Sequence, residues 1–219
     1  MFPTHNAMKT SSPTLPHSHG ISFARRTSSL GRIVALASLS AAVASAATVE
    51  TIATGLNNPR GLDFVPNGAL FVAEAGTGGG PLAPSIQGPE GLVHFGLTGS
   101  VTRIFKGAQE RVALNLPSLA AADGSGATGP SAISFSGTGN ALLTVGLGAD
   151  PAARDLLPSA AAGLGWLYQM NQNGHVKAIA DIAAFEGKTN ADGNLPDSNP
   201  NGVHGDRGGD AFVADAGAN

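Results

Sequence analysis

A repeated motif constrains this chain more than any other feature. Residues 58–76 begin with Asn-Pro-Arg-Gly, end with Phe-Val-Ala-Glu-Ala-Gly, and return without a gap as residues 199–217. Nine of the nineteen aligned positions are identical. A more divergent copy starts at Gly129-Pro130 and keeps Phe135 and Gly139, so the three prolines stand 71 and 70 residues apart. A fixed period of this size indicates a repeat architecture.

Each copy reads as two short strands around a tight turn. In the first copy, the apolar residues 62–65 and 70–73 flank Asn67-Gly68, a pair that tolerates the positive φ of a hairpin turn. Two more hairpins are expected in the intervening sequence, one turning at Thr98-Gly99 and one at Asn173-Gly174. Two hairpins per period give about four strands, as in one blade of a propeller.

The sequence therefore predicts an all-β fold, a β-propeller fragment of about two and a half four-stranded blades with long inter-hairpin loops. We expect blade 1 at residues 47–122, blade 2 at 123–195 and the truncated start of blade 3 at 196–219. A parallel β-helix and a β-sandwich are the alternatives, but Asn-Gly hairpins disfavour the first and the long period disfavours the second. The period exceeds the roughly 40–50 residues of a blade. The surplus lies in the Gly-, Pro- and Ala-rich residues 77–91 and 148–165, which we expect to be loops on the binding face.

The N-terminal residues 1–46 are expected to be a disordered tail followed by a secretory signal peptide. Arg25-Arg26 and Arg32 precede an apolar run at residues 33–43, and Ala44-Ser45-Ala46 has the small residues of a cleavage site. The run is short for a bilayer span, and a buried helix is the alternative. We expect cleavage near Ala46, a secreted or periplasmic location, and no membrane span in the mature chain.

The mature chain is short for a closed ring. Its 173 residues hold about 2.5 repeats, whereas propellers close with about 4–8 blades. We therefore expect a partial sequence, with closure by several chains around one axis as the alternative.

Composition limits the partners. The net charge is −3, the few Lys and Arg residues are scattered, and aromatic residues make up 5%, so a nucleic-acid partner is not expected. The absence of cysteine excludes disulfides and thiolate metal sites. The partner is expected to be a small molecule or a protein of unknown identity.

The assembled motifs resemble the ScyD/ScyE family of secreted bacterial proteins. The segments that carry the resemblance are residues 55–62, 70–76, 88–91, 98–103, 109–112, 116–120, 128–130, 144–148, 197–200 and 213–217. The resemblance implies an exported β-propeller related to the NHL and gluconolactonase-like groups, without an established reaction. Members of this family often carry cysteines in the loop before the second hairpin, where residues 85–95 here have none. Residues 204–207 also replace an apolar strand of the family pattern.

Glu74 and Asp215 occupy the same place in their copies, directly after an apolar strand. In related propellers, carboxylates near the central channel can hold a divalent cation, usually Ca²⁺ with oxygen ligands. The middle copy offers Thr144 and Val145 there instead of an acid. We therefore interpret Glu74 and Asp215 as strand-end carboxylates that bind loop amides, and we assign no metal ligand, cofactor or catalytic residue.

Other polar residues also read as structural. Residues 190–199 have the alternating oxygens of a calcium loop but lack the glycine and glutamate of an EF-hand, and Asp123 opens a second such turn. We expect both to be solvated turns. His94, His175 and His204 lack metal-ligand spacing, and we expect each on the surface.

Two functions are compatible with these features. The first is an exported binding or scaffold module whose long loops recognise a partner. The alternative is a gluconolactonase-like hydrolase that uses a channel-bound divalent cation as a Lewis acid. Fold alone does not choose between them, and the lack of a recurring acid or histidine set favours the binding module over an enzyme.

Overall fold

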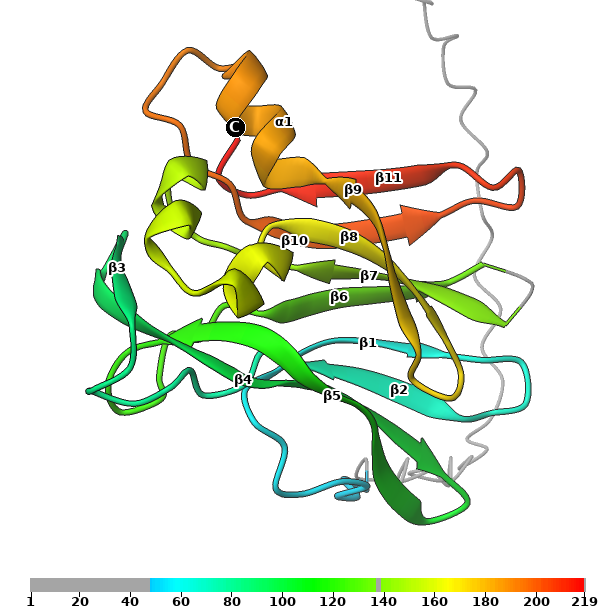
Figure 1. Ribbon diagram of the computed structural model, residues 1–219. Coiled ribbons are helices and arrows are strands. Elements are labelled where there is room, and N and C mark those ends of the chain that lie inside the picture. The colour runs from blue at the N-terminus through cyan, green and yellow to red at the C-terminus, as the bar shows by residue number, and fades with distance from the viewer. Residues whose placement is uncertain (1–47, 137–138, 219) are drawn as a thin grey trace, which may run out of the picture. The chain divides into compact units, whose positions relative to one another are not determined.

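Antiparallel strands dominate the part of the chain that the computed structural model describes, residues 48–136 and 139–218 (Figure 1). Strands account for 48% of the structure, which confirms the all-β prediction. The predicted tail and signal peptide, residues 1–46, lie outside the described residues. The described strands belong to one compact unit, Val49–Asn219. The description below concerns this unit.

Most strands of the described residues belong to two sheets and a hairpin. The first sheet has the order β1 (Pro59–Phe64), β2 (Leu70–Glu74), β4 (Gly91–Phe105), β3 (Ser85–Gly88), and β5 (Ala108–Ala120) also pairs with β4. The second has the order β6 (Pro130–Phe135), β7 (Asn140–Val145), β8 (Trp166–Asn171), β9 (Val176–Asp181). The hairpin joins β10 (Pro200–Gly205) to β11 (Ala211–Asp215). These groups fall within the three predicted blade ranges, and the boundaries between blades stay a prediction.

The hairpins β1–β2, β6–β7 and β10–β11 have the same register. Each begins with a proline, and the pairing shifts by a bulge directly after it. Corresponding pairs are Pro59–Glu74, Pro130–Val145 and Pro200–Asp215 near the start, and Phe64–Leu70, Phe135–Ala141 and Gly205–Ala211 near the turn. Positions that match in this way are called equivalent below.

These hairpins pack face to face in chain order (Figure 1). A core cluster joins the first sheet to the second through Phe71 and Val101 on one side and Ile133 and Leu143 on the other, all at most 5% exposed. The strands approach closely because a glycine stands at the contact: a Cβ at Gly61 would lie 2.7 Å from the carbonyl oxygen of Ser131. The Asn-Pro-Arg-Gly motif therefore marks the start of β1 and also supplies the glycine that the close contact with β6 requires.

The hairpin predicted at Thr98-Gly99 is wrong. Strand β4 runs without interruption through both residues and turns at Lys106-Gly107, where the positive φ values of 49° and 78° suit a two-residue hairpin turn. Gly99 serves close packing instead, because a Cβ there would lie 2.6 Å from Cδ of Pro130. The first sheet has five strands among the described residues where four were expected, because β3 and β5 were not predicted and the two strands expected around Thr98-Gly99 are the single strand β4.

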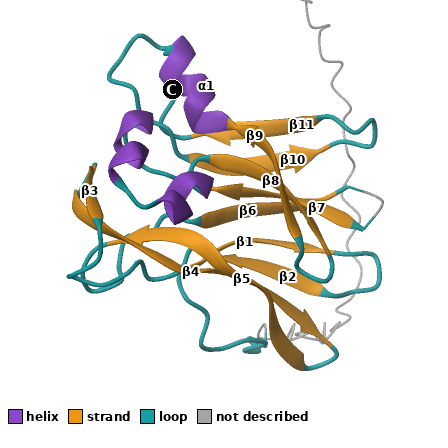
Figure 2. Ribbon diagram, in the orientation of Figure 1, coloured by secondary structure: helices purple, strands orange, loops and turns teal. Residues whose placement is uncertain are grey.

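The two segments expected as loops contain short elements. Residues 77–91 include β3, and residues 148–165 include the 3₁₀ helices Pro151–Leu156 and Ser159–Gly163. The helix α1 (Ile182–Thr189) was not predicted, although Asp181 caps its first turn and Asn190 ends it in the left-handed conformation. Figure 2 shows these helices gathered on one side of the sheets. No helix in the described part of the chain is both long and apolar enough to cross a bilayer.

Candidate functional site

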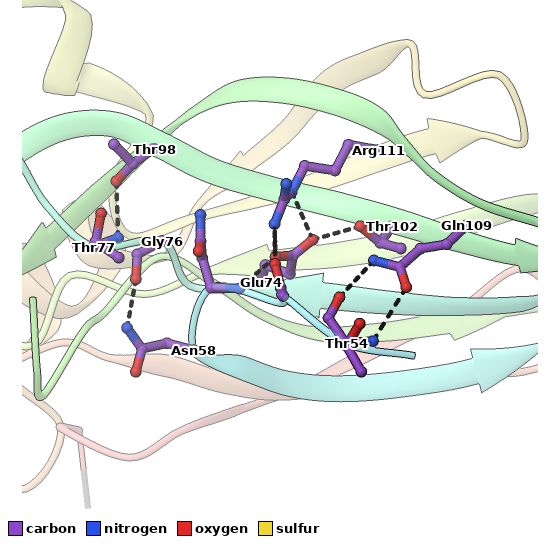
Figure 3. A network of polar contacts seen from close by, with 11 residues as sticks. Thr54, Asn58, Glu74, Gly76, Thr77, Thr98, Thr102, Gln109 and Arg111 are labelled. Carbon is purple, nitrogen blue, oxygen red and sulfur yellow. Dashed lines mark hydrogen bonds and ion pairs between the residues drawn. The ribbon is translucent and has the colours of Figure 1, made fainter. Parts of the chain in front are cut away.

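The strand-end acid Glu74 lies at the centre of a buried polar network (Figure 3). Its carboxylate accepts hydrogen bonds from the backbone N–H of Asn57 at 2.6 Å and from Oγ1 of Thr102 at 2.5 Å. Arg111 donates to both carboxylate oxygens, from Nε at 3.1 Å and from Nη2 at 2.8 Å. Residue 74 is placed here because it follows Val72 on the same face of β2, opposite Ser100 and beside Thr102 of β4.

The network fixes the ionisation of Glu74 and the path of the chain before β1. Burial by itself would raise the pKa of this carboxyl, but the hydrogen bonds from Arg111, Thr102 and the Asn57 amide outweigh it and hold the pKa below its ordinary value. Arg111 also donates to the carbonyl oxygen of Gly55 at 2.7 Å. The charged pair therefore attaches the segment before β1 to the sheet.

Asp215 makes the same kind of attachment at the equivalent position of the third hairpin. Its carboxylate accepts from the backbone N–H of Asn199 at 2.5 Å, from Oγ of Ser198 at 2.7 Å and from the N–H of Gly217 at 3.0 Å. The prediction that these acids bind loop amides is confirmed. In the second hairpin the equivalent residue is Val145, and the neighbouring Thr144 accepts from the N–H of Ala132 instead.

The predicted turns are also confirmed as turns. Asp192 accepts from the N–H of Asn194 at 2.9 Å, and Asp123 accepts from the N–H of Ser125 at 2.9 Å. Hydrogen bonds favour the charged carboxylates and lower the pKa of both acids. On Asp123 they come from the hydroxyl and then the N–H of Ser125, and on Asp192 from the N–H and then the side-chain amide of Asn194. Asp197 differs, because Oδ1 is buried without a partner in the described structure, and burial followed by the nearby Asp215 charge raises its pKa.

The histidines divide into two groups. His175 and His204 are exposed, as predicted. The prediction for His94 is wrong: its side chain is 7% exposed, in the part of β4 that pairs with β3, where Ser85 is its register partner. Its Nδ1 lies 3.4 Å from the carbonyl oxygen of Ala83. The pattern around residue 94 could not reveal this, since the carbonyl beside its ring comes from Ala83, in a Gly- and Pro-rich segment that was expected to be a loop. Within residues 48–136 and 139–218, no group of three or more His, Asp or Glu side chains could hold a metal ion.

A pocket of about 430 Å³ is the best candidate for a binding site. It lies near the starts of β1, β6 and β10, where Arg60, Thr128 and Asn199 line it. Residues 89–93, at the turn between β3 and β4, and residues from the loop between β5 and β6 complete the walls. Both long segments contribute to it, the first through Pro89–Gly91 and the second through Gly148. Both segments therefore border this pocket.

The pocket combines charged, polar and apolar groups. Nη2 of Arg60 donates to the carbonyl oxygen of Ala127 at 2.6 Å, which fixes the guanidinium against the wall. Glu90 is exposed at the rim, and Leu92 and Val93 supply an apolar side. Oδ1 of Asn199 is buried and has no hydrogen-bond partner among the described residues. Such a lining can hold a small polar molecule by its donors and acceptors while covering an apolar edge.

Sequence reasoning did not single out Arg60. The available signal is that the first copy has an arginine where the other copies have Ser131 and Asn201. A residue that departs from a repeat in this way is a candidate for function, because packing requires only what the copies share.

Comparisons of the chain with protein-family models, with curated proteins and with solved structures found no match.

Proposed function

We propose that this protein is an exported binding or scaffold module of the β-propeller type, similar to the ScyD/ScyE family, with the Arg60 pocket as its recognition site. The proposal joins two observations: hairpins of equal register packed in series, and a pocket at the end where these hairpins begin. The second sheet also has the four-stranded antiparallel order of a propeller blade.

The Arg60 pocket is the observation that carries the binding role. Its volume falls within the range of about 300–1,000 Å³ that is usual for small-molecule sites. Glu74 and Asp215, which are equivalent in the repeat, already accept hydrogen bonds from groups of the same chain. Arg111 and Thr102 donate to Glu74, and Ser198 donates to Asp215. These contacts support a structural role for the acids and a binding role for the pocket. The ligand class that fits is a small polar molecule that offers an acceptor to Arg60.

Saturation-transfer NMR tests this role. The probe is a mixture of monosaccharides, sugar acids and dipeptides, measured with the wild-type chain and with Arg60→Ala. We expect at least one component to bind the wild type and to lose about tenfold or more in affinity with Arg60→Ala. The matched control is Arg103→Ala, which removes an arginine paired with Glu110 on the surface, outside the pocket. It is expected to bind like the wild type.

Two results would contradict the proposal. One is that no component of the mixture binds the wild type, and the other is that Arg60→Ala binds as well as Arg103→Ala. Hydrolysis of a sugar lactone by the wild type that disappears after chelation would instead establish the metal-dependent alternative.

The exported location is proposed from the basic residues, apolar run and Ala-Ser-Ala sequence of the N-terminal region. Intact-mass measurement of the protein recovered from the producing cell's exterior or periplasm tests it. A mature chain that begins near Ala47 is expected, and an uncleaved chain retained in the cytoplasm would contradict it.

A further inference from the structure

A second pocket, of about 410 Å³, lies beside the two 3₁₀ helices. It is lined by Arg154 and Asp155 of the first of these helices, by Trp166 at the start of β8 and by Asp181 at the end of β9. Leu157, Pro158, Ser159 and Ala162 complete its walls. In the described part of the chain it shares no lining residue with the Arg60 pocket. It is therefore a separate site, called the Trp166 pocket below.

The Trp166 pocket lies on the face of the second sheet that meets the first sheet. Trp166 is the register partner of Val145 on β7, and directly opposed residues of an antiparallel pair share a face. Val145 belongs to a core cluster with Leu119 of the first sheet. The hairpin β10–β11 packs on the other face, where a Cβ at Gly205 would lie 3.0 Å from Cδ1 of Leu142. The pocket is therefore on the side of the sheet that lies inside the hairpin series.

The repeat does not require a tryptophan at this position. Val145 and Glu74 are equivalent, and their register partners on the next strand are Trp166 and Ser100. A side chain as small as serine is therefore sufficient at this position in the first sheet. Trp166 is the single tryptophan of the chain. As with Arg60, departure from the repeat beside a pocket makes this residue a candidate for function.

The indole of Trp166 contributes an apolar ring to the pocket. The residue is partly exposed, whereas its Nε1 is buried and has no hydrogen-bond partner among the described residues. Any exposed part of the indole is therefore carbon. Tyr168 lies beside the ring, with centroids 6.5 Å apart, and its hydroxyl donates to the carbonyl oxygen of Gly163 at 3.2 Å. The pocket thus has a flat aromatic surface at one wall.

A charged pair provides hydrogen-bonding groups in the same pocket. Arg154 donates to both carboxylate oxygens of Asp181, from Nη1 at 3.0 Å and from Nη2 at 2.8 Å. Its Nη1 also donates to the carbonyl oxygen of Leu164 at 2.8 Å. A guanidinium has five N–H groups, so Arg154 retains donors beyond these three contacts. The two side chains are 15% and 21% exposed. The pair is therefore fixed by the fold and still reachable by a ligand.

The charges of the lining select among classes of ligand. Asp155 is exposed, so two carboxylates accompany one arginine, and Asp181 already pairs with that arginine. An anion would meet a net negative charge. A cation would lack the acceptors that the free donors of Arg154 need. A neutral molecule that both donates and accepts hydrogen bonds, and that has one apolar face, matches every part of the lining.

We propose that the Trp166 pocket binds a neutral saccharide, with one sugar ring lying on the indole of Trp166. The hydroxyl groups of a sugar both donate and accept, so they can bond to Arg154 and Asp155 while the C–H face covers the aromatic ring. The volume is within the range of about 300–1,000 Å³ that is usual for small-molecule sites. This site is independent of the Arg60 pocket, and neither proposal requires the other.

Tryptophan fluorescence of the full chain tests the proposal directly, because Trp166 is the only source of that signal. The probes are neutral trisaccharides built from glucose, galactose, mannose or N-acetylglucosamine, each titrated with the wild type. We expect at least one trisaccharide to change the emission saturably. Its sulfated counterpart is expected to bind more weakly, because the lining carries net negative charge. Arg60→Ala is expected to bind like the wild type, which separates this test from that of the Arg60 pocket.

Variants locate the binding. Ala162→Phe fills the pocket from an exposed position, keeps Trp166 for the fluorescence measurement, and is expected to weaken binding about tenfold or more. In saturation-transfer NMR, Trp166→Ala is expected to lose as much, while Trp166→Phe keeps an aromatic surface and stays within about threefold of the wild type. Phe185→Ala is the matched control, since Phe185 is a 64% exposed aromatic residue outside the lining. Circular dichroism verifies that each variant is folded.

The proposal is overturned if no trisaccharide changes the emission up to about 10 mM. It is also overturned if Ala162→Phe binds as well as Phe185→Ala, because the ligand would then lie elsewhere. Tighter binding of the sulfated trisaccharide than of the neutral one would overturn it as well, since the pocket would then select an anion.

Discussion

Replacing Glu74 by glutamine tests whether the buried network holds the segment before β1. The carboxylate accepts from Arg111 through both oxygens, so the amide NH₂ of Gln would face a donor in either orientation. At least two hydrogen bonds to a charged group would be lost, each contributing about 1.5–3 kcal/mol.

The net effect is smaller than that sum. The side chain of Arg111 is 35% exposed and can rehydrate after the change, so about half of the loss is recovered. We expect Glu74→Gln to lower the free energy of unfolding by about 2–3 kcal/mol. For a chain of this size the melting temperature falls by about 4–12 °C.

Urea denaturation at pH 7 measures this difference. The protein has one tryptophan, Trp166, which lies on β8 of the second sheet, and its fluorescence is followed together with far-UV circular dichroism. Coincident transitions show that the sheets unfold together. Glu90→Gln, which removes an exposed carboxylate, is the control and is expected within about 0.5 kcal/mol of the wild type. If Glu74→Gln also stays within about 0.5 kcal/mol of the wild type, the network around Glu74 does not stabilise the fold.

Three further predictions concern the acids of the chain. Because hydrogen bonding lowers the pKa of Glu74 in the fold, its contribution to stability is present above the unfolded pKa of about 4.3 and is lost as the pH falls through the folded pKa. Acid titration of the unfolding free energy should therefore be shallower in Glu74→Gln than in the wild type. Asp181 caps α1 at the N–H of residue 184 and pairs with Arg154 at 2.8 Å, so Asp181→Ala should cost about 1–2 kcal/mol in urea, and Asp181→Asn, which keeps the cap, should cost less. For Asp197 the raised folded pKa means that ionisation opposes folding at neutral pH, so Asp197→Asn should raise the melting temperature at pH 7 and make no difference near pH 3. A melting temperature that falls at pH 7 would show that the charge of Asp197 has a stabilising partner.

The local features of the fold were predictable because short segments encode them. The hairpin at Asn67-Gly68 was predicted from two short, mainly apolar segments around an Asn-Gly turn, and the structure has Gly68 at a φ of 87°. The same holds for Asn173-Gly174 between β8 and β9, where Gly174 has a φ of 84°. In each case the turn conformation and the two strands are determined within about a dozen residues.

The errors arose where a residue serves a distant contact. Gly99 has the sequence context of a turn, yet it lies inside β4 because Pro130 approaches it closely. His94 was expected on the surface, yet its side chain is buried and its Nδ1 lies beside the carbonyl oxygen of Ala83. A glycine required for close approach and one required for positive φ look alike in a sequence, because the neighbour that distinguishes them is remote along the chain.

The candidate site was predictable in part. The segments around it and the structural role of the strand-end acids followed from the repeat, whereas the pocket and Arg60 did not. The pocket needs residues from the starts of separate hairpins and from the loops above them to converge, as Arg60, Glu90 and Asn199 do.

By itself, the sequence determined the all-β character, the principal hairpins and their equivalence, because turn conformation and the short apolar segments on either side of a turn involve near neighbours. Only the tertiary structure decided that β4 continues through Gly99, that His94 is buried, and that Phe71 packs on Phe135. These outcomes depend on which face of one hairpin meets the next. That choice is made by packing between residues about 70 positions apart, where sequence neighbours exert no direct constraint.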